Sequence, residues 1–370
     1  MEQYRGTWIQ VDLRAIAKNT VLLRRACGDT PHMMAVVKAN AYGHGMIEVA
    51  KTALANGADW LGVAIPEEGE ALRKAGIDAP ILVLGGVNEK GAEASVRYRL
   101  TQAVFDARRI EWLEQAAARL GMDVDVHIKC DTGMGRIGVR NEAEMRAVLS
   151  ALEKAPHVHL AGAFTHFADA DGADDVYSMA QIAAYERLQQ LLPQGILIHA
   201  AASAASLRYP QARYGMARQG ISLYGCPPLP EIKGLIPALS WHTEIIHVKV
   251  IEPGDCVSYG CTFRANKKMR VATLPVGYGD GYHRALSGKA QVLIRGMRCP
   301  VLGRVCMDQM MVDVSALPEV DVGDEAILLG RQGADEITAD ELAAWAGTIS
   351  YEMLLAPTKR VPVVYIEEKA

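Results

Sequence analysis

The chain has 370 residues, enough for about two domains with separate cores. Half of its residues are apolar, its net charge is −4, and acidic and basic residues are interspersed, which argues against a nucleic-acid-binding protein. The first residues, MEQYRGTWIQVDL, lack the basic start and apolar run of a secretory signal, and no apolar run reaches the roughly 18 residues that span a bilayer. We therefore predict a cytoplasmic protein.

The cysteines and histidines give no sign of a disulfide framework or a metal site. The seven cysteines form no C-x-x-C pair, and their odd number argues against complete disulfide pairing, so we expect buried thiols. His157 and His159 lie two residues apart, but no cluster of carboxylates or thiols accompanies them. We predict no bound metal.

Strand and helix patterns alternate through the first 220 residues or so. Residues 7–12 alternate like a short strand, and residues 13–26 carry apolar side chains at helical spacing. Further strand patterns lie at 33–38, 60–64, 81–84, 101–105, 124–130, 158–165, 195–199 and 215–217. Helical patterns lie between them, at 47–55, 67–74, 108–120, 142–154 and 177–192 among others. Eight strands with intervening helices predict an α/β fold, a closed parallel (β/α)8 TIM barrel.

The composition changes after Tyr224. A segment rich in proline and glycine follows, and beyond it short runs rich in Val, Ile and Thr predict a mainly-β domain with one helix at 339–345. The opening strand precedes the barrel, and we expect it to pair with this later sheet. The predicted organisation is a strand in 1–12 that joins the β domain, a barrel at 13–225, a linker at 226–237 and a C-terminal β domain at 238–370.

The stretch AVVKANAYGHG, residues 35–45, carries the most suggestive chemistry. An apolar strand pattern delivers a lone lysine, Lys38, to a loop of small residues and glycines. Partial burial disfavours an ammonium, so the neutral amine becomes available to form a Schiff base with a carbonyl. Position alone also fits a lysine that merely marks the exposed end of a strand.

This stretch resembles the cofactor-lysine segment of alanine racemases, which are pyridoxal-phosphate enzymes. Eight further segments resemble that family in the same order, over nearly the whole chain: KCDTGMGRIG (129–138), FTHFADAD (164–171), HAAASAA (199–205), RQGISLYG (218–225), VSYG (257–260), GYGDGY (277–282), GRVCMDQ (303–309) and YE (351–352). The resemblance implies a homodimer with shared active sites that interconverts L- and D-alanine and supplies D-alanine for peptidoglycan.

The predicted barrel places several of these segments on one rim. Active sites of such barrels lie at the C-terminal ends of the strands. Lys38 ends the first strand pattern, Arg136 follows the fifth, His166 ends the sixth, Ser203 follows the seventh, and residues 220–221 follow the eighth. The last two positions are where this fold usually binds phosphate.

The resemblance implies a role for each matched residue around pyridoxal 5′-phosphate. Lys38 bonds the cofactor, and Arg136 contacts its phenolic oxygen beside Lys129, which is carbamylated in some members of the family. Arg218 faces the pyridine nitrogen, and a permanently charged donor cannot take the ring proton, which favours reprotonation of the α-carbon over transamination. The phosphate is held by Tyr42, Ser203, Gly220, Ile221 and Tyr351.

Racemisation needs bases on opposite faces of one carbanion, because a single fixed base returns the proton to the side it left. The resemblance assigns one face to Lys38 and the other to Tyr259, which comes from the partner subunit. Tyrosine is almost fully protonated at neutral pH. In the family a series of hydrogen bonds favours the phenolate. The resemblance implies that this series runs here from Tyr259 to His166, with His199 and Arg218 behind His166.

The resemblance also gives a substrate site and two departures from the family pattern. Met307 and Asp308 match the segment that binds the substrate carboxylate, while Tyr278 and Tyr351 narrow the entry to suit a methyl side chain. Such a pocket rejects serine only weakly, although serine-accepting relatives lack the matched Tyr351. Where the family usually has Asn and Pro, this chain has Ala202 and Gln219.

Other interpretations fit the sequence less well. GMGRIG, residues 133–138, fits the dinucleotide-binding pattern G-x-G-x-x-G, but it follows the fifth strand and no acidic residue ends the next strand pattern. A pyridoxal-phosphate decarboxylase is opposed by Arg218, since decarboxylation benefits from a protonated ring. A cofactor carrier without catalysis would lack the second domain. A serine or broad-specificity amino-acid racemase stays open.

Overall fold

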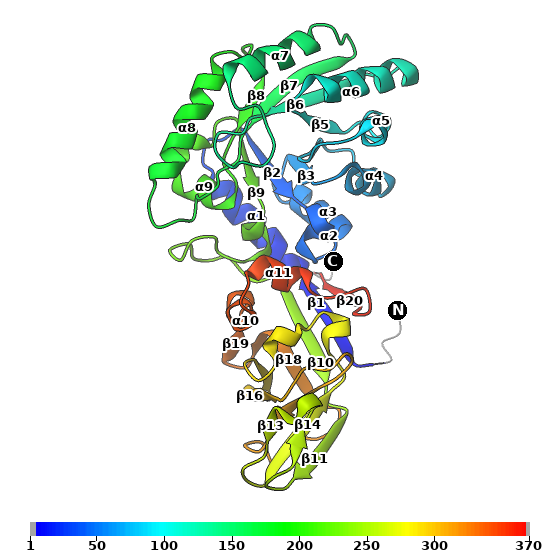
Figure 1. Cartoon of the computed structure of the whole chain (residues 1–370), viewed down its shortest axis with the longest axis vertical. Coiled ribbons are helices and arrows are strands. Elements are labelled where there is room, and N and C mark those ends of the chain that lie inside the picture. The colour runs from blue at the N-terminus through cyan, green and yellow to red at the C-terminus, as the bar shows by residue number, and fades with distance from the viewer. Residues whose placement is uncertain (1–4, 368–370) are drawn as a thin grey trace. The chain divides into compact units, whose positions relative to one another are not determined.

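A computed structural model describes residues 5–367, which divide into two compact units (Figure 1). The barrel unit comprises Ile16–Ala41 and Gly45–Ile236. The β unit comprises, among the described residues, 5–15, Tyr42–His44 and 237–367. No helix in residues 5–367 is both long and apolar enough to cross a bilayer.

Eight parallel strands form the centre of the barrel unit. Their order is β8-β7-β6-β5-β4-β3-β2-β9, with bounds β2 His32–Val36, β3 Trp60–Val63, β4 Ile81–Val83, β5 Thr101–Val104, β6 Val124–Lys129, β7 Val158–Phe164, β8 Leu197–His199 and β9 Met216–Gln219. The sheet closes because Gly215 N–H donates to Ile198 O (2.9 Å) and Arg218 N–H donates to Ala201 O (3.0 Å), which joins the last strand to β8. The predicted (β/α)8 barrel is confirmed.

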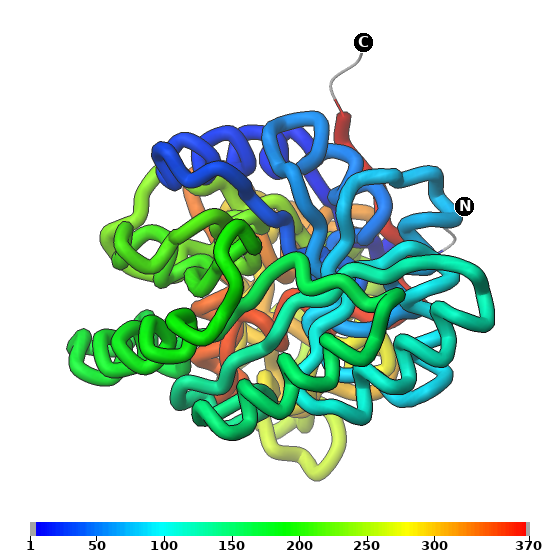
Figure 2. Tube along the Cα trace, turned by 90° about the horizontal axis from the view of Figure 1, so that it is seen from above, coloured from blue at the N-terminus to red at the C-terminus, as the bar shows by residue number. Residues whose placement is uncertain are grey.

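Helices cover the outside of this barrel, and the trace passes around the ring from blue through cyan to green in Figure 2. Asn88, Asp106 and Asn141 each accept the backbone N–H three residues on, which explains where three of these helices begin. The helices are α1 Leu13–Ala26, α3 Met46–Ala55, α4 Pro66–Lys74, α5 Glu89–Arg97, α6 Ala107–Leu120, α7 Glu142–Leu152, α8 Val176–Gln189 and α9 Ser203–Arg208.

The first barrel strand ends earlier than the apolar pattern predicts. It stops at Val36, and the next residues form a left-handed turn, α2 Lys38–Tyr42, in which Ala39, Asn40 and Ala41 have φ of 51°, 53° and 54°. Left-handed backbone costs L-residues roughly 1–2 kcal/mol each. Here it is held by hydrogen bonds from Ala39 N–H to Glu68 Oε1 (2.6 Å) and from Met46 N–H to Asn40 Oδ1 (3.0 Å). The prediction of strand up to residue 38 was therefore wrong by two residues.

The β unit is built on a ten-stranded sheet. Its strands are β1 Thr7–Asp12, β10 Leu239–Glu244, β11 His247–Ile251, β14 Met269–Leu274, β15 Gln291–Ile294, β16 Met297–Leu302, β17 Met310–Asp313, β18 Glu325–Gln332, β19 Asp335–Ile337 and β20 Val363–Ile366. Strand β1 pairs antiparallel with β10 and parallel with β20. An N-terminal strand therefore lies between two strands from the C-terminal part of the chain. A separate hairpin is formed by β12 Cys256–Val257 and β13 Phe263–Arg264.

Two helices lie in the described part of the β unit, whereas the sequence pattern predicted one. Helix α10 Ala339–Ala346 matches the predicted helix, and α11 Ser350–Leu355 was missed. Six residues are too few for a 3.6-residue period to show. Residues 5–367 of the two units also contain five 3-10 turns: η1 Pro210–Ala212, η2 Ile221–Tyr224, η3 Tyr259–Cys261, η4 Tyr278–Asp280 and η5 Arg284–Leu286.

Candidate active site

Lys38 leaves β2 at the C-terminal rim of the barrel and is half-buried. Burial lowers the pKa of its ammonium, and the positive charge of Arg136 lowers it further, while Glu68 opposes both. A lowered pKa increases the fraction of neutral amine, which is the nucleophilic form. Burial and the neighbouring charge of Arg136 therefore favour a reactive lysine at this position.

Arg136 lies on the loop between β6 and α7. The loop folds back on itself because Asp131 Oδ1 accepts the N–H groups of Gly133 (3.1 Å) and Gly135 (3.0 Å). A Cβ at Gly138 would lie 2.5 Å from Asp131 N, so only glycine fits there. The glycines of GMGRIG are thus needed for the backbone conformation of this loop. Arg136 is exposed and has no hydrogen bond or ion pair with another described residue, so its guanidinium is available to an anionic oxygen.

Lys129 is a buried cation next to other cations. Its Nζ donates to Cys130 O over 2.7 Å and lies 5.3 Å from the centre of the Phe164 ring. Burial lowers the pKa of Lys129 to about 8, with further lowering by the charges of Arg218 and Arg136. A sizeable neutral fraction near neutral pH follows.

Arg218, on β9, is buried and hydrogen-bonded without a carboxylate partner. Its Nη1 donates to His199 Nδ1 (2.9 Å), and its Nη2 donates to the carbonyls of Thr165 and Ala200 (2.8 Å each) and faces His166 Nδ1 at 3.3 Å. Burial lowers the pKa of Arg218 to about 10, so the guanidinium stays charged at neutral pH. No described residue accepts from its Nε–H, which leaves this donor for a ligand.

The contact with Arg218 sets the protonation of the histidines behind it. Because His199 Nδ1 accepts from the guanidinium, His199 carries its proton on Nε2 and donates it to His127 Nδ1, 2.9 Å away. His127 then carries its proton on Nε2, a buried atom without a partner among the described residues. Burial lowers the pKa of His127 to about 3 and holds those of His166 and His199 well below the usual value.

Sequence reasoning overlooked His127. It lies two residues before Lys129 on β6, and in a strand such residues point to the same face. That spacing is the signal that would have found it, since it places His127 beside a lysine that the resemblance had already marked.

Three further candidates meet at the ends of β8 and β9. Gly220 N–H donates to Ser203 Oγ over 2.9 Å, and Ile221 begins the turn that follows. All three residues are buried or nearly so. The structure thus brings Lys38, Lys129, Arg136, His166, His199, Ser203, Arg218, Gly220 and Ile221 to the barrel unit.

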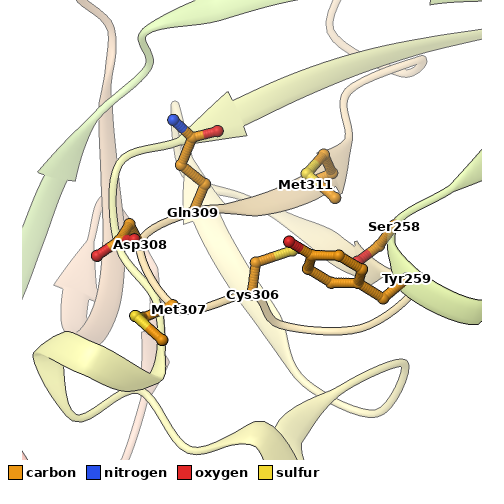
Figure 3. A pocket seen from close by; sticks show the side chains of 7 residues that line it. All are labelled: Ser258, Tyr259, Cys306, Met307, Asp308, Gln309 and Met311. Atoms are coloured by element: carbon orange, nitrogen blue, oxygen red, sulfur yellow. The ribbon is translucent and has the colours of Figure 1, made fainter.

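The β unit carries the other candidates, three of which meet at one hollow. A cavity of about 390 Å³ is lined by Ser258, Tyr259, Cys306, Met307, Asp308, Gln309 and Met311. Figure 3 shows the Tyr259 ring on one side of it and Met307 and Asp308 on the other. Tyr259 is 71% exposed. It follows Ser258, whose φ of 66° is held by a hydrogen bond from Ser258 Oγ to Arg304 O (2.6 Å).

The segment Met307–Asp308 is fixed by backbone contacts from GYGDGY. Tyr278 N–H donates to Cys306 O (3.0 Å) and Gly279 N–H donates to Met307 O (2.8 Å). A Cβ at Gly277 would lie 2.2 Å from Cys306 O, which requires glycine. The Asp308 carboxylate accepts a hydrogen bond from Arg360 Nη2 over 2.8 Å. Among the described residues, nothing accepts from the backbone N–H groups of Met307 and Asp308.

Two tyrosines complete the set within the β unit. The rings of Tyr42 and Tyr351 are 5.9 Å apart and inclined by 49°. Burial raises the pKa of Tyr42, and the neighbouring Tyr351 phenol raises it further. Tyr42 therefore stays a hydroxyl donor over the whole neutral range.

Comparison with known proteins places this arrangement in a family. Residues 11–228 match the family described as alanine racemase, N-terminal domain, and residues 238–365 match alanine racemase, C-terminal domain. The chain belongs to the alanine racemase family. An alanine racemase of Symbiobacterium thermophilum is 48% identical over 377 residues, which cover 100% of both chains.

Solved structures agree with this assignment. The alanine racemase from Bacillus anthracis with bound L-Ala-P has 39% sequence identity and a TM-score of 0.93, with 100% of this chain and 97% of that chain covered. A histidine racemase from Leuconostoc mesenteroides has 29% identity and a TM-score of 0.90, with 99% of each chain covered. The resemblance found in the sequence is confirmed: the protein is an isomerase, an amino-acid racemase, and alanine racemase activity is well supported. The family uses pyridoxal phosphate.

Proposed function

We propose that this protein is a homodimer that interconverts L- and D-alanine with pyridoxal 5′-phosphate, using Lys38 and Tyr259 of the partner subunit as its two bases. The observation that carries the proposal is the Lys38 amine, whose pKa is lowered by burial and by Arg136. We further propose that the product D-alanine supplies peptidoglycan synthesis.

The donors in the barrel unit fit this cofactor chemically. Lys38 offers an amine for its aldehyde, Arg136 offers an unpaired guanidinium for its phenolic oxygen, and Arg218 offers Nε–H for its ring nitrogen. Its phosphate suits Ser203 and the N–H groups of Gly220 and Ile221, and the resemblance adds Tyr42 and Tyr351. When bound, pyridoxal phosphate draws electrons from the α-carbon of the attached amino acid and makes the α-proton acidic.

Lys38 and Tyr259 would move that proton on opposite faces of the α-carbon. The neutral Lys38 amine accepts the proton on one face, and the phenol of Tyr259 delivers one on the other. In the reverse direction the roles exchange. Exposure of Tyr259 in the single chain suits a side chain that acts in a second copy.

Arg218 would favour racemisation over competing reactions. Its charged donor supplies no site for the ring proton, because a guanidinium accepts no hydrogen bond. His199 and His166 accept from it and are neutral. The surroundings therefore offer the ring nitrogen no acid other than a guanidinium, which keeps negative charge at the α-carbon and opposes a decarboxylase function.

The substrate carboxylate would bind to main-chain donors of the segment Met307–Asp308. The Asp308 side chain is itself an anion paired with Arg360, so it cannot attract a second carboxylate. The N–H groups of Met307 and Asp308 are the available donors. Tyr278 and Tyr351 would limit the space for the side chain, which favours alanine over serine and other amino acids.

The experiment is a spectrum of the purified protein before and after borohydride, followed by peptide mapping and an assay for D-alanine. We expect a visible absorption band that borohydride removes, added mass on the peptide that contains Lys38, and formation of D-alanine from L-alanine. A protein that remains colourless when supplied with pyridoxal phosphate would contradict the proposal.

The two-base assignment is tested with Tyr259→Phe in deuterated water. We expect an unchanged absorption spectrum and a loss of racemisation of about a hundredfold or more. We propose that Tyr259 removes the α-proton of L-alanine and Lys38 that of D-alanine, so exchange of the α-proton of D-alanine should persist. Normal racemisation in this variant would exclude Tyr259 as the second base.

A further inference from the structure

A buried polar cluster lies directly behind Ser203, on the side of the barrel where β9 runs into η2. Its members are Ser206, Gln219 and Ser222, each with no exposed surface, together with the thiol of Cys27. Gln219 Nε2 contacts Ser206 Oγ at 2.9 Å and Cys27 Sγ at 3.3 Å. Ser222 Oγ lies 2.9 Å from both Gln219 Oε1 and Ser203 Oγ.

The donors in this cluster can be assigned one by one. Ser206 spends its only proton on the carbonyl of Ser203, 2.9 Å away, so Ser206 Oγ must accept from the amide of Gln219. This orients the amide and leaves Gln219 Oε1 facing Ser222, which donates its own proton there. The same hydroxyl proton also faces Ser203, because Ser222 Oγ donates to Ser203 Oγ over 2.9 Å.

We propose that Gln219 and Ser222 are positioning residues that hold the hydroxyl of Ser203 ready to bind a phosphate group. Ser203 Oγ accepts from Ser222, whose hydroxyl Gln219 Oε1 holds in place, so the proton of Ser203 is the one that turns towards an arriving anion. Gly220 N–H steadies the same oxygen at 2.9 Å. The inference rests on the proposed function, in which Ser203 binds the phosphate of the cofactor.

One of these positioning residues, Gln219, is a departure from the family pattern. At position 219 the family usually has proline, which has no side-chain acceptor. Gln219 supplies one, which accepts from Ser222.

The test measures cofactor affinity on the full-length apoprotein. Pyridoxal phosphate and pyridoxal, which lacks the phosphate, are titrated by absorbance into the wild type, Ser222→Ala, Gln219→Leu and the double variant. We expect Kd for pyridoxal phosphate to rise about three- to tenfold in each single variant, the size of one neutral hydrogen bond. Kd for pyridoxal should stay unchanged. The double variant should bind pyridoxal phosphate no more weakly than the weaker-binding single variant, since both substitutions disrupt the same hydrogen-bonded arrangement.

The matched control is Ser95→Ala. Ser95 Oγ also donates to a buried glutamine, Gln102 Oε1 at 2.9 Å, elsewhere in the barrel unit. We expect it to bind both ligands like the wild type. Thermal unfolding checks that each variant folds, and Ser222→Ala, which removes one oxygen atom, decides the matter by itself if Gln219→Leu does not fold.

The outcomes separate this inference from the proposed function. A wild-type protein that binds pyridoxal phosphate while Ser222→Ala binds it equally well would overturn the positioning role alone. An equal loss for pyridoxal and pyridoxal phosphate would overturn it too, because the effect would not act through the phosphate. A wild type without affinity for pyridoxal phosphate would overturn the proposed function and this inference with it.

Discussion

Arg218 donates a hydrogen bond to His199 Nδ1 across 2.9 Å, and this contact makes His199 an acceptor on one side and a donor on the other. The donor side reaches His127 at 2.9 Å. A charged guanidinium in a buried place thus keeps two imidazoles neutral, because a protonated His199 could not accept from it.

We predict that acid destabilises the protein through these histidines. In the unfolded chain an imidazole binds its proton below a pH of about 6.5, whereas folded His127 does so only near a pKa of about 3. The unfolded state therefore binds more protons in this range, and stability is lost as the pH falls from about 6.5 towards 3. Each such histidine contributes about 1.4 kcal/mol per pH unit.

The measurement is the free energy of unfolding in urea at pH 7, 6 and 5. His127→Gln should reduce the slope against pH by about one proton. His247→Gln, which changes an exposed histidine, should leave the slope unchanged. A slope in His127→Gln equal to that of the wild type would contradict the neutral assignment.

Lys129 is expected to react with carbon dioxide. At pH 7 a pKa of about 8 leaves about a tenth of the amine neutral, and the resulting carbamate would be stabilised by the charges of Arg218 and Arg136. Carbon-13 NMR with labelled bicarbonate should show a carbamate signal that grows between pH 7 and 9. The signal should be absent in Lys129→Ala and present in Lys154→Ala, which alters an exposed lysine.

Arg360→Ala should weaken substrate binding with little effect on kcat. Its loss leaves the Asp308 carboxylate unpaired next to the proposed site for the substrate carboxylate, and like charges repel. We expect KM for alanine to rise about threefold, in line with the modest strength of exposed ion pairs. Adding Asp308→Asn should restore KM. A KM that stays high in the double variant would show that Arg360 acts otherwise.

Tyr351→Thr should relax the preference for alanine over serine. Removing the ring opens space beside Tyr42, and a site that excludes one small group sterically discriminates about 10- to 200-fold. We expect the ratio of kcat/KM for serine to that for alanine to rise about tenfold. Tyr351→Phe keeps the ring and should keep the ratio. An unchanged ratio in Tyr351→Thr would place the specificity elsewhere.

Local sequence patterns were enough to predict the barrel and the family. Alternating strand and helix patterns predicted eight parallel strands, because strands buried on both faces read as continuous apolar runs. Local patterns could not predict where β2 ends. The left-handed turn after Val36 is stabilised by a hydrogen bond from Ala39 N–H to Glu68, which lies 29 positions further along the chain. Local patterns also missed α11, which is too short to show a period.

What the sequence determined by itself is therefore the order of elements, the family and the identity of the candidate residues, since these depend on patterns within a few residues of each other. The tertiary structure decided which of those residues touch and which way their protons point. His127 and His199 are 72 residues apart, and Ser203 and Ser222 are 19 apart. Only closure of the barrel brings such pairs within hydrogen-bonding distance, and only the complete network of donors and acceptors fixes each proton.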